Sequence, residues 1–419
     1  METRKVAEIV YRSDLYPRTK SDPVLVQLYA DNIEQMPPIE INQRNELIDG
    51  WHRWTAHKKL ELSDIHVEIT TTSSDAELLE LAIQRNAIHG RQLSQDDKKE
   101  MARKLYLANQ DKYSKDNLVK LLSASKSSIY SWLSDIDKAE REKRKKIIRE
   151  MWMACYTEEE IANIVKVSQD TVNKEVLQIN TDLEKSVKVN FFEEGWTPPI
   201  YNVWTFAKKT NDVKHFGNSE QRILDNLLYL YTNPLDIIID PFGGGGATID
   251  VCKNRMRRYW ISDRKPIVER ETEIRKLDIC QELPPLNKRW SEVTLTYLDP
   301  PYWKQAENQY SVDKEDLANM PIEEFTEKLS SVIRRISEKQ SNGVIAMLMQ
   351  PTQWLAPDRQ FTDHITQVIQ VVGNKNLVIE NRISCPYSTE QYNAQMVNWA
   401  KENKKLLVIS RELIVWRLL

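Results

Sequence analysis

Two short motifs lie fewer than sixty positions apart in the second half of the chain, and each directly follows a short apolar run. The first motif is D-P-F-G-G-G-G-A-T, Asp240 to Thr248, and it follows Ile237-Ile238-Ile239. The second is D-P-P-Y, Asp299 to Tyr302, and it follows Thr294 to Leu298. A continuous β-branched run is typical of a strand buried on both faces. We therefore expect each motif at the carboxyl end of a buried strand.

Four successive glycines, Gly243 to Gly246, form the centre of the first motif, although the whole chain has only ten. Glycine permits positive φ angles and lets backbone N–H groups approach a ligand closely. The spacing differs from the dinucleotide pattern G-x-G-x-x-G, and no Lys-Ser/Thr pair follows, which disfavours NAD and a phosphate-binding P-loop. These glycines predict a different nucleotide-type cofactor, with a purely structural turn as the alternative.

The first motif resembles motif I of the S-adenosylmethionine-dependent amino-methyltransferases of DNA, usually D-P-F-x-G-S-G-T-T. Gly245 and Ala247 stand where that family usually has Ser and Thr. The resemblance covers roughly residues 190 to 419 and implies a Rossmann-like α/β domain whose seven-stranded sheet ends in an antiparallel pair. The implied cofactor is S-adenosylmethionine. Its expected contacts in this motif are Asp240, Pro241, Phe242, Gly243, Gly244 and Gly246.

Two acidic residues downstream match other cofactor-binding positions of that family. Asp263 ends the strand-like run from Arg258, about twenty residues after the glycines, and is suited to bidentate contact with ribose hydroxyls; a solvated loop aspartate is the alternative. Asp278 resembles the acid that approaches the adenine of the cofactor. Upstream, His215 to Asn218 precedes an apolar helix, Ile223 to Tyr231, where the family has a motif beside the methionine end of the cofactor.

The D-P-P-Y motif fits the chemistry of a base amine, which is a poor nucleophile because its lone pair is delocalised into the ring. Asp299 and the C=O of Pro300 can accept the two amine hydrogens, and Pro300 and Pro301 stiffen the turn. Tyr302 offers a flat face for stacking a base that has left the duplex. RNA and protein-glutamine methyltransferases use similar tetrapeptides, so the glycine motif upstream provides the specificity. Asp at the first position favours adenine N6; the cytosine N4 enzymes more often have Ser there.

The order and spacing of the motifs leave no room for a large target-recognition domain between or after them. The first 185 residues carry two helix-turn-helix patterns, at 117–133 and 157–172, and Thr157 with Glu160 forms a capping box at the second. Helical hairpins that only pack are the alternative. A basic run, 138–149, is either a phosphate-binding face or a solvated helix face. The expected DNA contacts are Lys126, Ser127, Tyr130, Gln169, Asp170, Asn173 and Lys174.

Residues 1 to 95 resemble the N-terminal domain of the ParB partition family. Gly50, Arg53 and Ala56 follow its G-E-R-R-x-x-A pattern, and Asn86 lies in a segment similar to E-N-x-x-R. The resemblance implies CTP or ATP binding at Gly50, Arg53 and Asn86. Trp51 and His52 replace the glutamate and first arginine of the pattern, which argues against hydrolysis. The alternative is a retained scaffold that positions the helices behind it.

Composition agrees with a soluble protein of two or three domains. The 419 residues are 41% hydrophobic and 29% charged, with a net charge of −3, and no run of eighteen apolar residues or N-terminal leader is present. We expect a cytoplasmic, nucleoid-associated protein with no membrane partner. The four cysteines and six histidines lack metal-ligand spacing, so no metal is expected. The doubled helix-turn-helix pattern favours a homodimer.

The sequence predicts three domains: a ParB-like domain at 1–95, a helix-turn-helix region at 96–185 and a methyltransferase domain at 190–419, with a hinge at 181–197. The predicted function is that of a site-specific, adenine-specific DNA methyltransferase acting on double-stranded DNA. The alternatives are a cytosine N4 DNA methyltransferase, an RNA methyltransferase and a non-enzymatic, ParB-like DNA-binding regulator. The recognised sequence and any restriction partner are left open.

Overall fold

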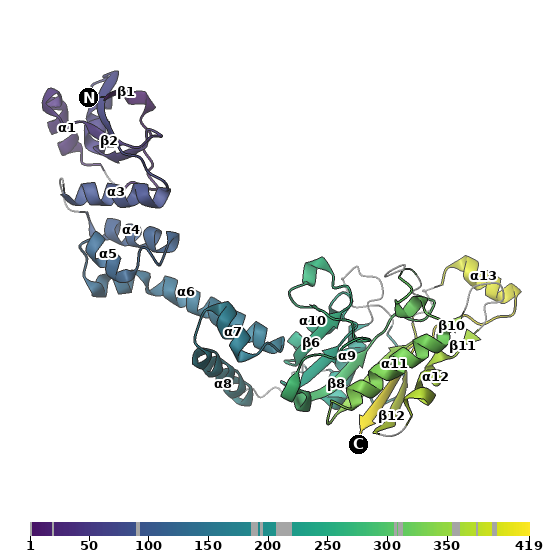
Figure 1. The fold of residues 1–419 in the computed structure, drawn as a ribbon. Helices are drawn as coiled ribbons and strands as arrows, with labels where there is room; N and C mark the ends of the chain where they lie inside the picture. Colours follow the sequence, from purple (N-terminus) through teal and green to yellow (C-terminus); the bar gives the residue numbers. More distant parts are fainter. Residues whose placement is uncertain are drawn as a thin grey trace. The chain divides into compact units, whose positions relative to one another are not determined.

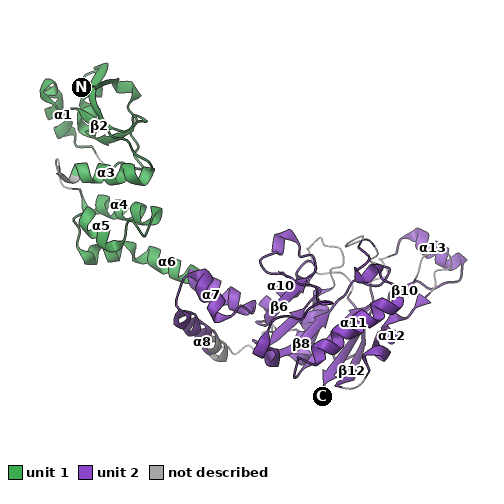
Figure 2. Ribbon diagram, in the orientation of Figure 1, with its two compact units in different colours: residues 1–143 green, residues 144–419 purple. Residues whose placement is uncertain are grey.

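The computed structural model describes residues 2–18, 21–88, 93–185, 192, 196–206, 220–305, 308, 313–353, 361–373, 376–387 and 392–419. The chain forms two compact units, residues 1–143 and 144–419 (Figure 2). The boundary lies inside the long helix α6 (Lys126–Met153), not at the hinge expected at 181–197. The three-domain division stays a prediction. The segment from His215 to Asn218 lies outside the described residues.

The first unit begins with a four-stranded sheet in the order β1-β4-β2-β3, formed by Glu2–Lys5, Asp64–Ile69, Ile39–Ile41 and Leu47–Asp49. Strand β2 pairs parallel with β4 and antiparallel with β3. Aliphatic side chains of β2 and β4 form a core with Trp54 of α2. The helices of this unit are α1 (Pro23–Asp31), α2 (Trp51–Lys59), α3 (Asp75–Ile88), α4 (Gln95–Ala108), α5 (Lys115–Leu121) and the first part of α6.

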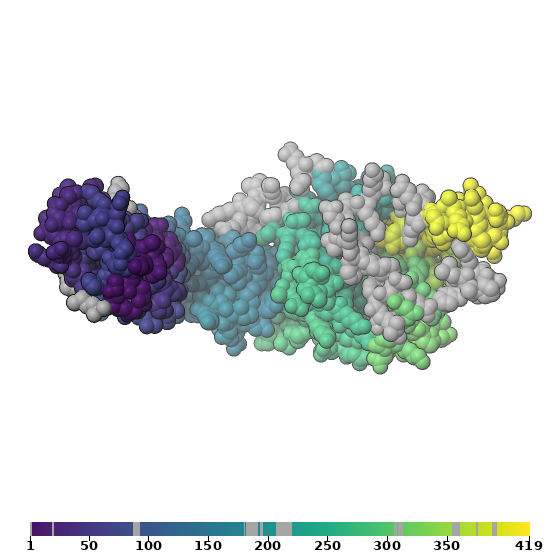
Figure 3. All heavy atoms as spheres, turned by 90° about the horizontal axis from the view of Figure 1, so that it is seen from above, coloured from purple at the N-terminus to yellow at the C-terminus, as the bar shows by residue number. Residues whose placement is uncertain are grey.

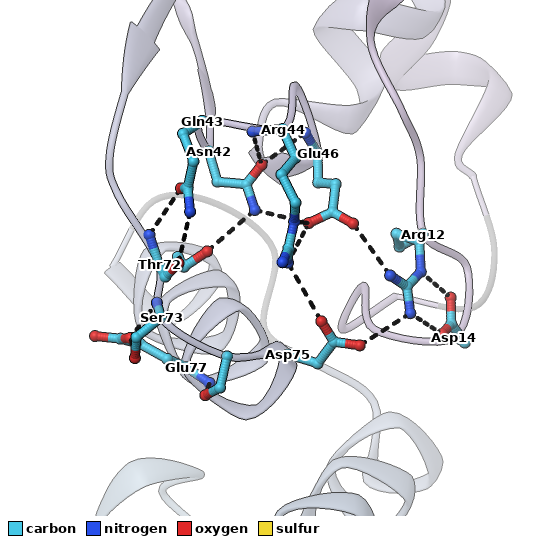
Figure 4. Close-up of polar contacts among 11 residues, drawn as sticks. Arg12, Asp14, Asn42, Gln43, Arg44, Glu46, Thr72, Ser73, Asp75 and Glu77 are labelled. Carbon is cyan, nitrogen blue, oxygen red and sulfur yellow. Dashed lines mark hydrogen bonds and ion pairs between the residues drawn. The ribbon is translucent and has the colours of Figure 1, made fainter.

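A polar network fastens the turn between β2 and β3 to the start of α3 (Figure 4). Asn42 is fully buried, and its amide donates to Glu46 at 2.7 Å and to Thr72 at 3.0 Å. Arg12 and Arg44 both pair with Glu46 and with Asp75. Burial raises the pKa of Glu46, but the hydrogen bonds from Asn42, Arg44 and Arg12 outweigh this and hold the pKa below its ordinary value. The network therefore stabilises the fold of this unit.

The second unit contains a seven-stranded sheet in the order β12-β13-β9-β8-β5-β6-β7 (Figure 1). Strand β13 is antiparallel to both β9 and β12, and the other neighbouring pairs are parallel. This confirms the predicted α/β class and the terminal antiparallel pair. The strands are β5 (Ile237–Asp240), β6 (Arg258–Asp263), β7 (Arg275–Lys276), β8 (Val293–Leu298), β9 (Val344–Met349), β12 (Leu377–Ser384) and β13 (Glu412–Leu418).

One predicted strand is wrong. Residues 405–410 form no strand, and instead single hydrogen bonds from Tyr387 and Gln350 reach the carbonyl oxygens of Ile409 and Val408. Leu406 is 87% exposed, and residues 407–410 are partly buried. The seventh strand is the two-residue β7. Such a short polar segment carries no periodic signal, and it pairs because β6 lies beside it.

Helices cover both faces of the large sheet (Figure 1). Alternate residues of β5 point to opposite faces. Ile238 packs in the core that contains apolar residues of α9 (Gln221–Tyr231) and α10 (Ala247–Asn254). Ile237 and Ile239 pack in the core that contains those of α11 (Ile322–Ser337) and α12 (His364–Val372). The two motifs therefore follow strands with both faces buried, as predicted.

Outlying elements of the second unit contribute little to these cores. A small hairpin pairs β10 (Thr352–Gln353) with β11 (Phe361–Thr362). Helix α13 (Ala394–Glu402), yellow in Figure 3, protrudes from the surface of the unit and buries only Ala400. No helix in the described part of the chain combines the length and apolar character needed to cross a membrane.

The second predicted helical hairpin belongs to the same unit as the large sheet. It consists of α7 (Glu158–Val165) and α8 (Gln169–Lys185), and follows the end of α6. Arg275 of β7 donates to the carbonyl oxygen of Ala154 at 2.7 Å, and Arg289 donates to that of Cys155 at 2.6 Å. Cations at a helix C-terminus satisfy its last carbonyl groups. The end of α6 is therefore fastened to the sheet.

Candidate active site

The glycine turn after β5 is packed closely against β6. The N–H of Gly243 donates to the carbonyl oxygen of Ser262 at 2.8 Å. A Cβ atom at Gly243 would lie 2.6 Å from Cγ2 of Ile261 and 3.1 Å from the same carbonyl oxygen. Only glycine allows this approach without a shift of the backbone. The turn is therefore held rigidly at the carboxyl end of β5.

Gly246 ends the turn and begins α10, and it has a φ of +79°. Its carbonyl oxygen accepts a hydrogen bond from Arg270 at 3.0 Å. The same guanidinium pairs with Asp250 and Glu273, which fixes it over the turn. Arg270 belongs to neither of the two sequence motifs, and its contact with the glycine turn becomes visible only in the folded chain.

Asp240, the first residue of the motif, is 2% exposed. Its carboxylate accepts from the Thr248 hydroxyl at 2.6 Å and from the N–H of Phe242 at 2.9 Å. Burial raises the pKa of Asp240 to about 7, the two hydrogen bonds oppose this rise, and the charges of Asp299 and Asp263 add to it. Asp240 therefore organises the turn from inside and forms part of a group of three carboxylates.

The other two predicted cofactor acids are both anchored locally. Asp263, at the end of β6, accepts from the N–H of Gly244 at 3.0 Å and from that of Lys265 at 2.8 Å. Asp278 accepts from the N–H of Cys280 at 2.9 Å, and its carboxylate lies 3.7 Å from the guanidinium of Arg264. Asp263 thus touches the glycine turn directly, whereas Asp278 lies on the segment after β7.

The D-P-P-Y segment lies beside the glycine turn because the strands before them are neighbours. Strand β8 pairs parallel with β5, with Leu295 opposite Ile238 and Thr296 opposite Ile239. Both segments therefore leave the same edge of the sheet, which is where open α/β sheets bind ligands. Pro300 is buried, and Asp299, Pro301 and Tyr302 are partly buried. The Tyr302 hydroxyl donates to Asp299 at 3.2 Å.

Two residues near D-P-P-Y escaped the sequence analysis. Arg411 is 3% exposed and lies just before β13, and its guanidinium carbon is 3.9 Å from the ring centroid of Tyr387. The side chain of Tyr387 also lies next to that of Tyr302, and both Tyr302 and Arg411 influence its pKa. Burial raises the pKa of Tyr302 well above its ordinary value, so its hydroxyl stays a donor. The available signal for Tyr387 was an aromatic residue three positions after the end of β12.

The predicted DNA contacts of the first unit lie on an exposed helix start. Tyr130 is 44% exposed, and its ring centroid is 4.7 Å from the ammonium of Lys115 and 5.6 Å from that of Lys126. Lys126 also pairs with Asp116 at 3.3 Å, and Ser127 is exposed. Lys115, absent from the prediction, belongs to this group of cations around an aromatic ring.

The predicted DNA contacts of the second unit are all exposed at the start of α8: Gln169, Asp170, Asn173 and Lys174. Val172 is fully buried, and the predicted capping box of Thr157 and Glu160 is present. The helix runs to Lys185 and is longer than the short helix expected. Lys174 pairs with Asp170 at 2.7 Å. DNA contact by either hairpin stays a prediction.

The predicted nucleotide-binding residues are occupied by contacts within the first unit. Arg53 donates to the carbonyl oxygens of Pro37 and Pro38 and pairs with Asp49 at 2.7 Å. The Asn86 amide donates to the carbonyl oxygen of Ala82, and its oxygen accepts from Arg18. Gly50 has a φ of +103°, and a Cβ there would lie 2.6 Å from Ile39. These contacts fit the scaffold interpretation, and nucleotide binding stays a prediction.

Comparison with solved structures finds ParB proteins at low similarity. A C-terminally truncated ParB from Caulobacter crescentus, complexed to the centromeric parS site, is 16% identical, covers 32% of this chain and 70% of its own, and has a TM-score of 0.24. A pNOB8-like ParB N-domain is 16% identical over 32% of this chain and 63% of its own, with a TM-score of 0.26. The Caulobacter protein with CTP-gamma-S is 14% identical over 42% and 98%, with a TM-score of 0.20. These TM-scores are too low to assign a fold.

The family comparison gives the informative match. No curated protein is similar enough to the chain to match it. Residues 88–269 match the family model described as DNA methylase. The matched stretch contains the glycine turn and Asp263, and it ends before Asp278 and Asp299. Over residues 88–269, the chain therefore matches the DNA methylase family.

Proposed function

We propose that the chain methylates the exocyclic amino group of a base in double-stranded DNA, with S-adenosylmethionine as methyl donor and adenine N6 as the favoured target. One observation carries the proposal. The glycine turn and D-P-P-Y leave adjacent parallel strands, β5 and β8, at one edge of the sheet. The DNA methylase match supports the same activity. The Asp at position 299 favours adenine, by resemblance to the adenine enzymes.

The residues at this edge fit the proposed cofactor. S-adenosylmethionine supplies an electrophilic methyl group when bound, and it carries positive charge and ribose hydroxyls. The glycine turn gives close access to backbone N–H groups, because Gly243 lies against β6 without a Cβ. Asp240 and Asp263 provide carboxylates next to the turn, and Asp278 lies on the segment after β7. Anionic groups of this kind suit a cationic ligand with hydroxyls.

The D-P-P-Y segment prepares the target nitrogen. The Asp299 carboxylate and the Pro300 carbonyl oxygen each accept one hydrogen of the amine, which draws its lone pair out of conjugation with the ring. The new N–C bond would form as the methyl–sulfur bond of the donor breaks and leaves a neutral thioether. Positive charge would then develop on the nitrogen, where the negative Asp299 would stabilise it electrostatically. The carboxylate can also take the proton that the nitrogen loses. The two prolines keep both acceptors in place before the base arrives.

Methyl transfer is tested by incubating the full chain with S-adenosylmethionine labelled on its methyl group and with duplex DNA or RNA. Nucleoside mass spectrometry then locates the label. We expect N6-methyladenine from duplex DNA. N4-methylcytosine would correct the target base, and label in RNA alone would correct the substrate class. A chain that binds the cofactor but labels no nucleic acid contradicts the proposal.

The substitution Gly243→Ala is expected to weaken cofactor binding. The new Cβ meets Ile261 at 2.6 Å, so the turn must move away from β6. Overpacking of this kind typically destabilises by about 1–3 kcal/mol. Isothermal titration with S-adenosylmethionine and thermal unfolding measure the two effects. Gly373→Ala is the control for cofactor binding, since a Cβ there has no neighbour within 4 Å; the φ of +68° strains alanine at this position, so its melting temperature should fall while its cofactor affinity does not change. Cofactor affinity equal to that of the wild type would show that the close approach is dispensable.

The substitution Lys126→Ala is expected to weaken binding to duplex DNA of any sequence. Lys126 is 65% exposed beside Tyr130, where it can neutralise a phosphate. Loss of one phosphate contact reduces the slope of log affinity against log salt by about one. Fluorescence anisotropy at several salt concentrations measures the slope. Lys5→Ala removes an exposed, ion-paired lysine from β1 and serves as the control. An unchanged slope in Lys126→Ala places the DNA contact elsewhere.

A further inference from the structure

Arg411 stands out among the buried side chains of the second unit. It is 3% exposed, and its Nη1 atom is buried with no hydrogen-bond partner among the described residues. A buried guanidinium is costly unless nearby groups compensate its charge. Strained or incompletely satisfied groups tend to persist where function requires them. The surroundings of Arg411 therefore indicate what it does.

The backbone around Arg411 fixes it firmly. Its Nε donates to the carbonyl oxygen of Cys385 at 3.0 Å, and the N–H of Cys385 donates back to the carbonyl oxygen of Arg411 at 2.8 Å. These bonds continue the pairing of β12 with β13 beyond Ser384 and Glu412. Strand β12 runs parallel to β8, because β13 is antiparallel to both β12 and β9 and β9 is parallel to β8. Arg411 thus lies at the edge where D-P-P-Y leaves β8.

A chain of contacts leads from the guanidinium to Asp299. Arg411 lies over the ring of Tyr387, 3.9 Å from its centroid. The side chain of Tyr387 lies next to those of Arg411 and Tyr302, and both influence its pKa. The Tyr302 hydroxyl donates to Asp299 at 3.2 Å. The buried cation is thereby connected through two phenol groups to the carboxylate of the D-P-P-Y motif.

The groups along this path also influence one another's pKa values. Burial lowers the pKa of Arg411, but the electrostatic influence of the surrounding residues, the Asp299 carboxylate among them, outweighs this and raises the pKa. Burial also raises the pKa of Tyr387. The guanidinium therefore stays charged, the phenols stay protonated, and the Tyr302 hydroxyl donates to Asp299. A carboxylate that accepts a hydrogen bond from a hydroxyl held in place by its neighbours is restricted to one orientation.

We propose that Arg411 is a positioning residue for methyl transfer: through Tyr387 and Tyr302 it orients the Asp299 carboxylate toward the amine of the target base. The inference rests on the proposed function and deepens it, since it makes the antiparallel strand pair β12 and β13 part of the active site. The catalytic group is still Asp299. Arg411 acts at a distance, and the cofactor residues on the other side of β8 do not depend on it.

The test compares Arg411→Met, Arg411→Lys and Tyr387→Phe in the full chain. We expect Arg411→Met to lower kcat about 100-fold, the loss typical of a misplaced reacting group, with the Kd for S-adenosylmethionine unchanged. Arg411→Lys keeps the charge and recovers part of the loss. Tyr387→Phe keeps the ring but removes the hydroxyl group, and we expect it to lower kcat about tenfold. Two controls away from the site are Arg417→Met and Tyr231→Phe, which break the contacts to Glu380 and Asn381.

A double-mutant cycle with Asp299→Asn decides whether Arg411 acts through Asp299. We expect Arg411→Met to lower activity little further once Asp299 is replaced, because the two residues form one functional unit. If Arg411→Met lowers activity by the same factor with and without Asp299→Asn, the proposal is overturned. It is also overturned if Arg411→Met lowers the melting temperature and leaves kcat unchanged, and Arg411 is then a structural residue. If the wild type transfers no methyl group, the proposed function itself fails. The cycle on melting temperature then still tests the coupling, and additive shifts would overturn it.

Discussion

Asp299→Asn is expected to reduce methyl transfer to duplex DNA by about 10²- to 10⁴-fold, the range typical of a lost acid–base group. Asparagine keeps one acceptor oxygen but presents N–H donors where the carboxylate had a second oxygen. Those donors face the hydrogens of the target amine, and no negative charge remains to stabilise the nitrogen as it becomes positive. The measurement is the single-turnover rate with labelled S-adenosylmethionine, with the Kd of the cofactor measured separately.

The cofactor affinity of Asp299→Asn separates a chemical defect from a folding defect. The glycine turn is held by Ser262, Asp263 and Arg270, none of which depends on Asp299, so cofactor binding should persist. Asp225→Asn, which alters an ion pair with Arg255 elsewhere in the unit, is the matched control and should retain the rate. An Asp299→Asn enzyme with a wild-type rate would remove the carboxylate from the proposed mechanism.

The strands that position the site could be predicted because the residue types in each short run indicate a buried strand. Ile237-Ile238-Ile239 is apolar on every face, as a doubly covered strand requires, and Thr294 to Leu298 combines leucine with β-branched and aromatic residues. Both became strands with buried residues on both faces. The residues after them, Asp240 and Asp299, were predictable for the same reason. A motif directly after such a strand lies at the carboxyl edge whatever the rest of the chain does.

The contacts that hold the site residues in place could not be predicted, because they join segments that are distant in the sequence. Arg411 lies at the same edge of the sheet as Asp299 only because β13 inserts between β9 and β12. Arg270 donates to Gly246 only because the loop after β6 brings it over the glycine turn. The strand predicted at 405–410 failed for the opposite reason. Leu406 to Ile409 are apolar, but they pair with no strand in the part of the chain that the structure describes; Leu406 is exposed and the other three are partly buried.

The second prediction with a large expected effect concerns the pH dependence of stability. Burial raises the folded-state pKa of Asp240 from 3.8 to about 7. Below pH 3.8 the carboxyl group is protonated in both the folded and the unfolded chain. Between 3.8 and about 7 the unfolded chain releases the proton while the folded chain retains it, so stability falls as pH rises. At about 1.4 kcal/mol per pKa unit, the loss amounts to about 4 kcal/mol above pH 7.

We therefore expect the ligand-free chain to lose stability between pH 4 and 7, and Asp240→Asn to show a smaller loss over that range. The groups that face Asp240 are Thr248 from α10, the N–H of Phe242 and the carboxylates of Asp263 and Asp299. Thr248→Val removes the hydroxyl that favours the ionised form, so its stability loss should extend to higher pH. Urea unfolding at a series of pH values measures all three chains. Parallel curves for wild type and Asp240→Asn would contradict the raised pKa. A cationic cofactor favours ionised Asp240, so S-adenosylmethionine should also bind the wild type more tightly as pH rises through 7, and this gain should disappear in Asp240→Asn.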